Sequence, residues 1–215
     1  MDDSGRSPKR WLDTTTPTLS GVLLASNNPD NASLAKAGET VTLSVESSEP
    51  LGGVTLVKPD GTDPKTLNPV GTEGTQWTLS KTIETGDNGP LEFRLRYTDL
   101  AGNSGEEVTS TTDETQVTMD TEAPDLSGYT LTVNGSRGFT AKPGDVLKLE
   151  ISTTESISTP TVKLAGQSVD ASGSESDWSA QRELLVSDTE GEIAVELILT
   201  DAAGNTLTLT HPQSE

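Results

Sequence analysis

The chain repeats its own sequence signatures at a nearly constant spacing. Thr-Asp-Leu-Ala-Gly-Asn at residues 98–103 returns as Thr-Asp-Ala-Ala-Gly-Asn at residues 200–205, 102 residues later. Asp-Thr-Thr-Thr-Pro at residues 13–17 returns as Asp-Thr-Glu-Ala-Pro at residues 120–124. The two offsets differ by only a few residues, which indicates loops of different length on a common frame. The sequence therefore predicts two copies of one domain.

The predicted domains span residues 13–119 and 120–215, and residues 1–12 are predicted to form a flexible tail or linker. Each copy has roughly a hundred residues, a size that can bury its own core. The polar composition of residues 1–12 is typical of a segment without fixed structure.

Apolar and polar residues alternate over short runs in both copies. The clearest runs are residues 41–45 and 91–97 in the first copy and residues 147–151 and 193–199 in the second. Alternation with a period of two is the signature of a strand with one buried face. Helical spacing of apolar residues is absent over any useful length, so the sequence predicts an all-β chain.

Residues that favour tight turns separate these runs. Lys-Pro-Asp-Gly at residues 58–61 and Ala-Gly-Gln at residues 165–167 favour tight hairpin turns, because glycine accepts a positive φ. Glycine-containing breaks at residues 86–90 and 188–191 precede the long strands. Short strands with turns every eight to twelve residues are typical of a β-sandwich, so we expect two tandem immunoglobulin-like antiparallel sandwiches.

The charge of the chain restricts its partners. The formal net charge is −20, which disfavours nucleic acid and anionic membrane surfaces, both of which require a basic face. Clustered carboxylates make divalent cations plausible ligands, although acidity alone also keeps an extended protein soluble. There are no cysteines, which excludes disulfides and thiolate metal sites. No apolar run approaches a membrane span, so we expect no membrane insertion.

The repeated motifs resemble those of the bacterial immunoglobulin-like tandem domains found in large surface adhesins and other exported repeat proteins. The similarity lies in the Asp-Thr-x-x-Pro start, the Lys-x-Gly-(Glu/Asp) motif at residues 36–39 and 142–145, and the Thr-Asp-x-Ala-Gly-Asn motif. It covers about residues 13–211. The second copy departs from the pattern at residues 134–139, where Asn-Gly-Ser-Arg-Gly-Phe replaces an asparagine-rich stretch.

This resemblance implies a non-catalytic stalk or extender segment of an exported bacterial surface protein, extracellular or at the cell surface. Its partners would be neighbouring immunoglobulin-like repeats, with any cell-surface or glycan ligand bound by other domains. The alternative is an accessory module of a secreted enzyme, such as one that binds polysaccharide. The single histidine, His211, lies near the C-terminus, so no Ser-His-Asp arrangement is expected in either domain.

The alternating strands of a sandwich bring loops from three segments to the end where the chain enters each domain. In the second copy that end collects Asp120, Glu155, Asp201 and Asn205, at the junction of the two predicted domains; the equivalent set in the first copy is Asp13, Glu49, Asp99 and Asn103. Ca²⁺ prefers such oxygen ligands, and several adhesins of this type hold calcium at domain junctions. The sequence therefore predicts a calcium site in each copy.

Two structural explanations compete with these functional ones. The aspartate and asparagine of the Thr-Asp-x-Ala-Gly-Asn motif are also favoured in a tight turn, and Glu49 and Glu155 could be solvated loop charges. Trp77 and Trp178 each begin a predicted strand, and we favour a core role for them over stacking on sugars.

Overall fold

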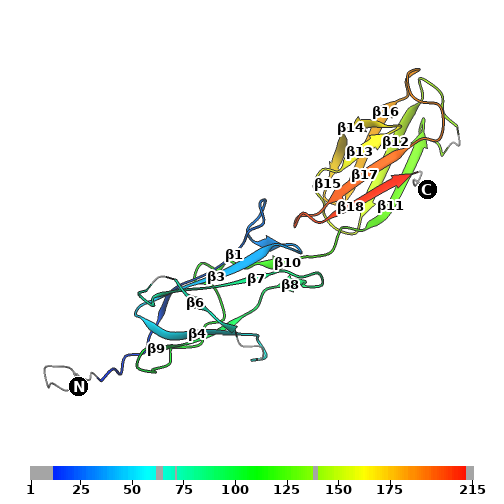
Figure 1. Cartoon of the computed structure of the whole chain (residues 1–215). Helices are drawn as coiled ribbons and strands as arrows, with labels where there is room; N and C mark the ends of the chain where they lie inside the picture. The colour runs from blue at the N-terminus through cyan, green and yellow to red at the C-terminus, as the bar shows by residue number, and fades with distance from the viewer. Residues whose placement is uncertain (1–11, 62–64, 71, 138–139, 212–215) are drawn as a thin grey trace. The chain divides into compact units, whose positions relative to one another are not determined.

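The computed structural model describes residues 12–61, 65–70, 72–137 and 140–211, and every regular element in these ranges is a β-strand (Figure 1). The predicted tail lies outside the described residues except for Leu12, which is exposed. The chain forms two compact units. Of the described residues, 12–27, 39–82 and 89–118 make up the first unit, and 28–38, 83–88 and 119–211 make up the second. The predicted domain limits stay predictions.

The first unit contains two antiparallel sheets. The four-stranded sheet has the order β1-β3-β7-β6, and the three-stranded sheet has the order β5-β4-β9. Their bounds are Leu19–Ser26 (β1), Thr40–Ser47 (β3), Leu51–Val57 (β4), Lys65–Thr66 (β5), Asn68–Pro69 (β6), Gln76–Thr82 (β7) and Arg94–Asp99 (β9). Three short strands lie outside these two sheets: Leu34–Ala35 (β2), Gly89–Pro90 (β8) and Thr118–Met119 (β10).

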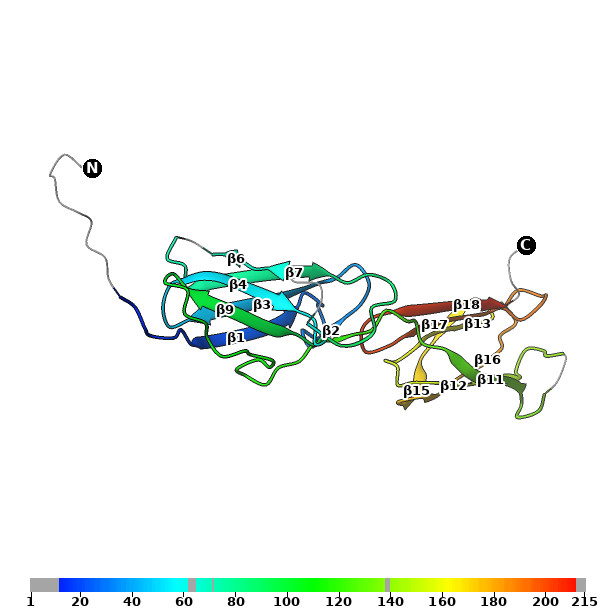
Figure 2. The same cartoon turned by 90° about the horizontal axis from the view of Figure 1, so that it is seen from below.

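The second unit repeats this arrangement with two four-stranded sheets, of order β11-β12-β16-β15 and β14-β13-β17-β18. Figure 2 shows the two layers, with β13, β17 and β18 in one and β11, β12, β15 and β16 in the other. The bounds are Leu126–Val133 (β11), Val146–Thr153 (β12), Thr161–Leu164 (β13), Gln167–Val169 (β14), Ala171–Ser174 (β15), Asp177–Glu183 (β16), Val195–Thr200 (β17) and Thr206–His211 (β18).

The strand order identifies the immunoglobulin-like sandwich that the sequence predicts. In immunoglobulin lettering, one sheet of each unit reads A-B-E-D, and the second sheet of the second unit reads C′-C-F-G. In the first unit, strand G is reduced to two bridges, which pair Leu95 with Val108 and Thr98 with Ser104. Strand β18 in the second unit instead pairs with β17 along its whole length.

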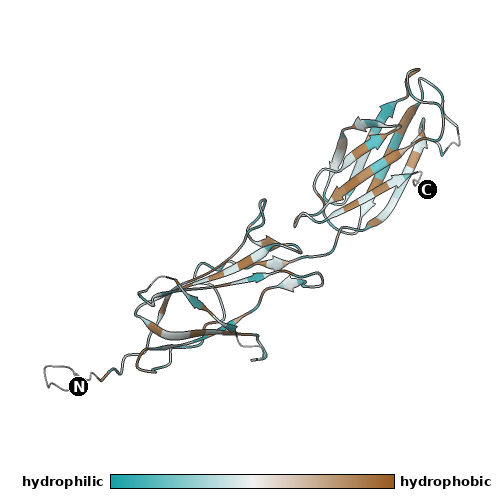
Figure 3. Ribbon diagram, viewed as in Figure 1, coloured by the Kyte–Doolittle hydropathy of each residue, from teal (hydrophilic) through white to brown (hydrophobic). Residues whose placement is uncertain are grey.

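The alternating runs form the core of each unit, and Figure 3 shows hydrophobic and hydrophilic residues alternating along the strands. In β3, Val41, Leu43 and Val45 are buried, as the alternation predicts. The buried cluster of the second unit includes the corresponding residues of β12, residues of β13, β16 and β17, and two residues outside the strands: Leu147, Leu149, Ile151, Ile157, Val162, Leu164, Ala180, Leu184, Leu197 and Leu199. Burial of these faces supplies the main driving force for folding.

The predicted turns are present, whereas two predicted strand starts are wrong. Gly61 N–H donates to the Lys58 carbonyl, and Ala165 and Gly166 both have positive φ, as a two-residue hairpin requires. Strand β17 starts at Val195 rather than at residue 193. Strand β9 starts at Arg94 rather than at residue 91. The backbone N–H of Leu91 donates to the carbonyl of Val117 instead of joining the sheet.

A close backbone contact fixes β4 against the end of β9. The pairing of β4 with β9 shifts register between Leu51 and Gly53. A Cβ atom on Gly52, between them, would lie 2.7 Å from the carbonyl oxygen of Asp99, whereas a Cβ atom on Gly53 would have no neighbour within 4 Å. Only glycine at residue 52 therefore permits this approach to Asp99.

We expect Gly52→Ala to destabilise the first unit by about 1–3 kcal/mol, because the backbone at Asp99 must shift to admit the methyl group. Gly53→Ala is the matched control, and it should leave stability unchanged or raise it by up to about 1 kcal/mol through the unfolded state. Hydrogen-exchange mass spectrometry in denaturant reports each unit separately. Equal effects of the two substitutions would contradict this account.

Candidate functional site

The turn at residues 98–103 is organised by one buried carboxylate. Asp99 is 3% exposed, and its Oδ1 accepts hydrogen bonds from the backbone N–H groups of Gly102 (2.7 Å) and Asn103 (2.8 Å). Its Oδ2 accepts a third bond from Asn103 Nδ2 at 2.7 Å. Gly102 has a φ of 95°, which L-residues with side chains rarely adopt. The aspartate and glycine of the motif therefore stabilise a tight turn, which is the structural explanation given for them from the sequence.

The turn at residues 200–205 of the second copy has the same hydrogen bonds between equivalent residues. Asp201 Oδ1 accepts from the N–H groups of Gly204 (2.7 Å) and Asn205 (2.8 Å), and its Oδ2 accepts from Asn205 Nδ2 at 2.9 Å. The backbone also closes in the same way, since Asp201 N–H donates to the Asn205 carbonyl at 3.1 Å. The duplicated sequence thus specifies a duplicated local geometry.

Each turn contacts the segment that leads into its sandwich. Asn103 Nδ2 donates to the backbone carbonyl of Asp13 (3.2 Å), and Asn205 Nδ2 donates to that of Asp120 (3.0 Å). Residues 13–17 and 120–124 are called the leading segments below. The two repeated signatures, far apart in sequence, are therefore neighbours in each unit, as the sandwich topology predicts.

A glutamate from a third segment completes each group. The carboxylates of Asp13, Glu49 and Asp99 offer one oxygen each within 4.8 Å of one another, and Asp120, Glu155 and Asp201 do the same. The loops that carry the glutamates are also alike. Ser47 Oγ donates to the Glu49 carbonyl at 2.6 Å, and Thr153 Oγ1 donates to the Glu155 carbonyl at 2.6 Å. The structure thus brings together the three predicted carboxylates of each set.

The two predicted asparagines lie beside these clusters but present their amide nitrogens to them. Both Asn103 and Asn205 donate to an aspartate carboxylate and to a leading-segment carbonyl. Each would join as a metal ligand only through its amide oxygen, which requires the amide to turn around. In the observed orientation the asparagines position the leading segments. Metal binding by either set stays a prediction.

The environment shifts the pKa of one carboxyl group in each cluster. Burial alone would raise the pKa of Asp99, but hydrogen bonds from the Asn103 side chain and from the backbone of the turn outweigh it, so this pKa lies below its ordinary value. Burial raises the pKa of Glu155, and the negative charges of Asp201 and Asp120 raise it further. The second cluster therefore holds mutually repelling charges.

The clusters have the chemistry of a hard-cation site. Carboxylate and carbonyl oxygens are the ligands that Ca²⁺ takes, at about six to eight per ion. Three carboxylates and a leading-segment carbonyl supply part of such a set, and water would supply the remainder. A cation there would offset the repulsion that adds to the effect of burial in raising the pKa of Glu155.

The turn of the second unit has a covering segment that sequence reasoning missed. Asn28, itself 7% exposed, donates from Nδ2 to the Ala203 carbonyl at 2.9 Å, and Lys36 Nζ donates to the Gly204 carbonyl at 2.8 Å. Residues 28–38 are called the covering segment below. Lys36 belongs to a repeated motif, but nothing in the sequence around it indicates a partner 168 residues away.

The tryptophans have structural roles. Trp77 is 7% exposed and donates from Nε1 to the Gly74 carbonyl. Trp178 packs against the core of the second unit and donates from Nε1 to the Glu175 carbonyl. The favoured core interpretation is confirmed for Trp77, and Trp178 is partly buried against the core.

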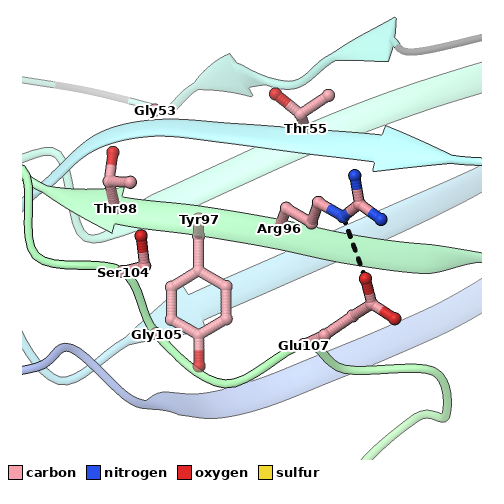
Figure 4. Close-up of a pocket in the computed structure, with 8 residues that line it drawn as sticks. All are labelled: Gly53, Thr55, Arg96, Tyr97, Thr98, Ser104, Gly105 and Glu107. Atoms are coloured by element: carbon pink, nitrogen blue, oxygen red, sulfur yellow. Dashed lines mark hydrogen bonds and ion pairs between the residues drawn. The ribbon is translucent and has the colours of Figure 1, made fainter. Parts of the chain in front are cut away.

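A polar hollow of about 400 Å³ lies on the first unit beside β4 and β9 (Figure 4). Arg96 and Glu107 form an ion pair at 2.9 Å across it, and the hydrogen bond from Arg96 contributes most to holding the pKa of Glu107 below its ordinary value. Hydroxyl groups of Thr55, Thr98 and Ser104 line the remainder. Tyr97 packs its ring against Gly105, where a Cβ atom would lie 2.1 Å from the ring.

Comparison with known proteins finds similarity in solved structures only. No family model matches the chain, and no curated protein matches it. An I-band fragment of titin aligns with a TM-score of 0.48 and 15% identity, over 92% of this chain and 65% of that one. A tandem pair of titin immunoglobulin domains (TM-score 0.31, 14% identity, 91% and 94% covered) and the human OSCAR ligand-binding domain (0.34, 16%, 87% and 96%) also align.

The immunoglobulin-like assignment rests on the strand order of the chain itself. Within the described residues, no helix has the length and apolar character needed to span a bilayer.

The raised pKa of Glu155 predicts an unusual pH dependence. The folded state binds this proton more tightly than the unfolded state. In calcium-free buffer, protonation of Glu155 should therefore increase the free energy of unfolding of the second unit as pH falls from neutrality. The gain should be complete near the ordinary glutamate pKa of about 4.3. Glu155→Gln should remove this gain and stabilise the unit at pH 7, as measured by hydrogen exchange between pH 4.5 and 7.5.

Glu190→Gln is the control, because it removes the same charge from an exposed loop residue. It should leave the pH dependence of the second unit unchanged. A Glu155→Gln variant that is less stable than the parent at pH 7 without calcium would show that the carboxylate makes a needed contact rather than an unfavourable one.

Proposed function

We propose that this chain is a non-catalytic stalk or extender segment of an exported bacterial surface protein of the adhesin type, with calcium bound at the two carboxylate clusters. The observation that carries the proposal is the repeated geometry of turn, leading segment and glutamate loop in the two units. A spacer needs the same connection at every repeat, whereas a catalytic protein needs chemistry concentrated in one place.

The electrostatics of the second cluster support a bound cation. Asp201 is 4% exposed, and Glu155 lies within 4.8 Å of it and of Asp120, measured between their potential ligand oxygens. Such proximity costs free energy unless positive charge compensates for it. Extracellular calcium modules bind their ion with dissociation constants of about 10⁻⁴–10⁻³ M. A site that fills at millimolar calcium fits a protein outside the cell.

Calcium at either cluster would tie three separate segments together. One ligand would come from the leading segment, one from the glutamate loop and one from the last residue of β9 (Asp99) or the residue after β17 (Asp201). A bound ion would therefore fix the direction in which the polypeptide enters each sandwich. Repeated along a chain of neighbouring repeats, this would hold a terminal ligand-binding domain away from the cell.

An accessory polysaccharide-binding module of a secreted enzyme is the second candidate. The polar hollow beside β4 and β9 favours it, because its hydroxyl, guanidinium and carboxylate groups suit hydroxyl-rich ligands. The structural roles of Trp77 and Trp178 count against it. Chemical shift changes at Thr55 and Arg96 on titration with a glycan panel would support this candidate, and their absence would reject it.

The extender proposal predicts stabilisation by calcium. At 10 mM calcium and the dissociation constants above, each occupied unit should gain about 1.4–2.7 kcal/mol, which raises its melting temperature by several degrees. Glu155→Gln should abolish the gain in the second unit only, and Glu49→Gln in the first unit only. Calorimetry combined with hydrogen exchange separates the two contributions.

Glu190→Gln should keep the full calcium effect, and magnesium at the same concentration should give a smaller one, because it demands stricter octahedral geometry. An unchanged melting temperature in 10 mM calcium would reject the calcium sites. Small-angle scattering then tests the extender role, since calcium should lengthen the average dimension of the parent chain but not of the Glu155→Gln variant.

A further inference from the structure

The same turn has two different environments in this chain. Ala203 is 2% exposed under the covering segment, whereas its equivalent, Ala101, is exposed. The difference is not intrinsic to the turns, because their internal hydrogen bonds match in partners and differ by 0.2 Å at most in length. What differs is the presence of the segment 28–38.

The covering segment recognises the turn through its backbone. Asn28 and Lys36 donate to the carbonyl oxygens of Ala203 and Gly204, so recognition requires the shape of the turn and a small side chain at residue 203. Asn28 is held for this role by its own Oδ1, which accepts from the N–H groups of Asp30 and Asn31 at 3.0 Å each. The contact therefore pairs a preorganised donor loop with two fixed acceptors.

The first unit has the same two carbonyl oxygens in its turn. Among the described residues, no hydrogen bond reaches the carbonyl oxygens of Ala101 and Gly102. Leu100, which replaces Ala202 of the second copy, is 77% exposed beside them. This surface combines the acceptors used at residues 203 and 204 with an additional apolar side chain.

We propose that the turn at residues 98–103 is a docking surface for a segment of the same kind as residues 28–38, supplied by a further copy of this repeat. The inference rests on the proposed function, in which neighbouring repeats flank this chain. The donor amide and ammonium groups of the docking segment would bond to the carbonyl oxygens of Ala101 and Gly102. Leu100 would pack against the apolar part of the segment.

The test uses a chain with a second copy of residues 13–119 inserted ahead of Asp13, and ¹³C-methyl alanine labelling. A soluble gadolinium chelate broadens exposed methyl groups. In the parent chain the Ala101 methyl should be strongly broadened and the Ala203 methyl protected. In the extended chain we expect Ala101 to become protected to the level of Ala203, which serves as the internal reference.

Matched variants in the inserted copy identify the contact. Asn28→Ala combined with Lys36→Ala should restore the broadening of Ala101, whereas Lys81→Ala, which removes one lysine from the surface of β7, should not. If Ala101 stays as exposed in the extended chain as in the parent while Ala203 stays protected, the docking proposal is wrong. That result would leave the calcium stabilisation and scattering tests of the extender role unaffected.

Discussion

The geometry of each candidate site depends on one buried aspartate that accepts three hydrogen bonds. Asp99 and Asp201 satisfy the N–H groups of their own turns and orient the asparagine four residues later. That asparagine in turn holds the carbonyl of the leading segment. Because a buried carboxylate is tolerated only when it is fully hydrogen-bonded, the turn, the asparagine and the leading segment form one interdependent unit.

This arrangement places two further carboxylates close to the buried aspartate, where additional negative charge is unfavourable. The leading segment contributes the side chain of Asp13 or Asp120, and the glutamate loop contributes Glu49 or Glu155, all within reach of the buried aspartate. In the second unit, burial raises the pKa of Glu155 most, and the charges of Asp201 and Asp120 raise it further. The hydrogen bonds of the turn do not use these two additional carboxylates, and their proximity to the buried aspartate is the reason for proposing a cation here.

Much of this could be predicted from local sequence. Alternation at residues 41–45 and 147–151 predicts β3 and β12, and the pairing of motifs with sandwich topology predicts that the turns meet the leading segments. The start of β9 could not be predicted, because Leu91 has strand-like alternation but its N–H is bonded to Val117. The contacts of Asn28 and Lys36 could not be predicted from the sequence either, since they depend on residues more than 160 positions away.

Comparing Ala101 with Ala203 distinguishes the turn structure that the motif specifies from the contacts that neighbouring segments add. The six-residue motif forms the same hydrogen-bonded turn in both copies, although Ala203 is buried and Ala101 is exposed. In the docking interface proposed above, the acceptors would lie on one part of the repeat and the donors on another, so two different surfaces would meet. An interface of this kind is called heterologous. Heterologous surfaces do not close on themselves, so a repeat built with them continues until a different surface ends the series. In the proposed docking, the acceptors would be two backbone carbonyl oxygens of one repeat and the donors would belong to the next, which is the open series that a spacer requires.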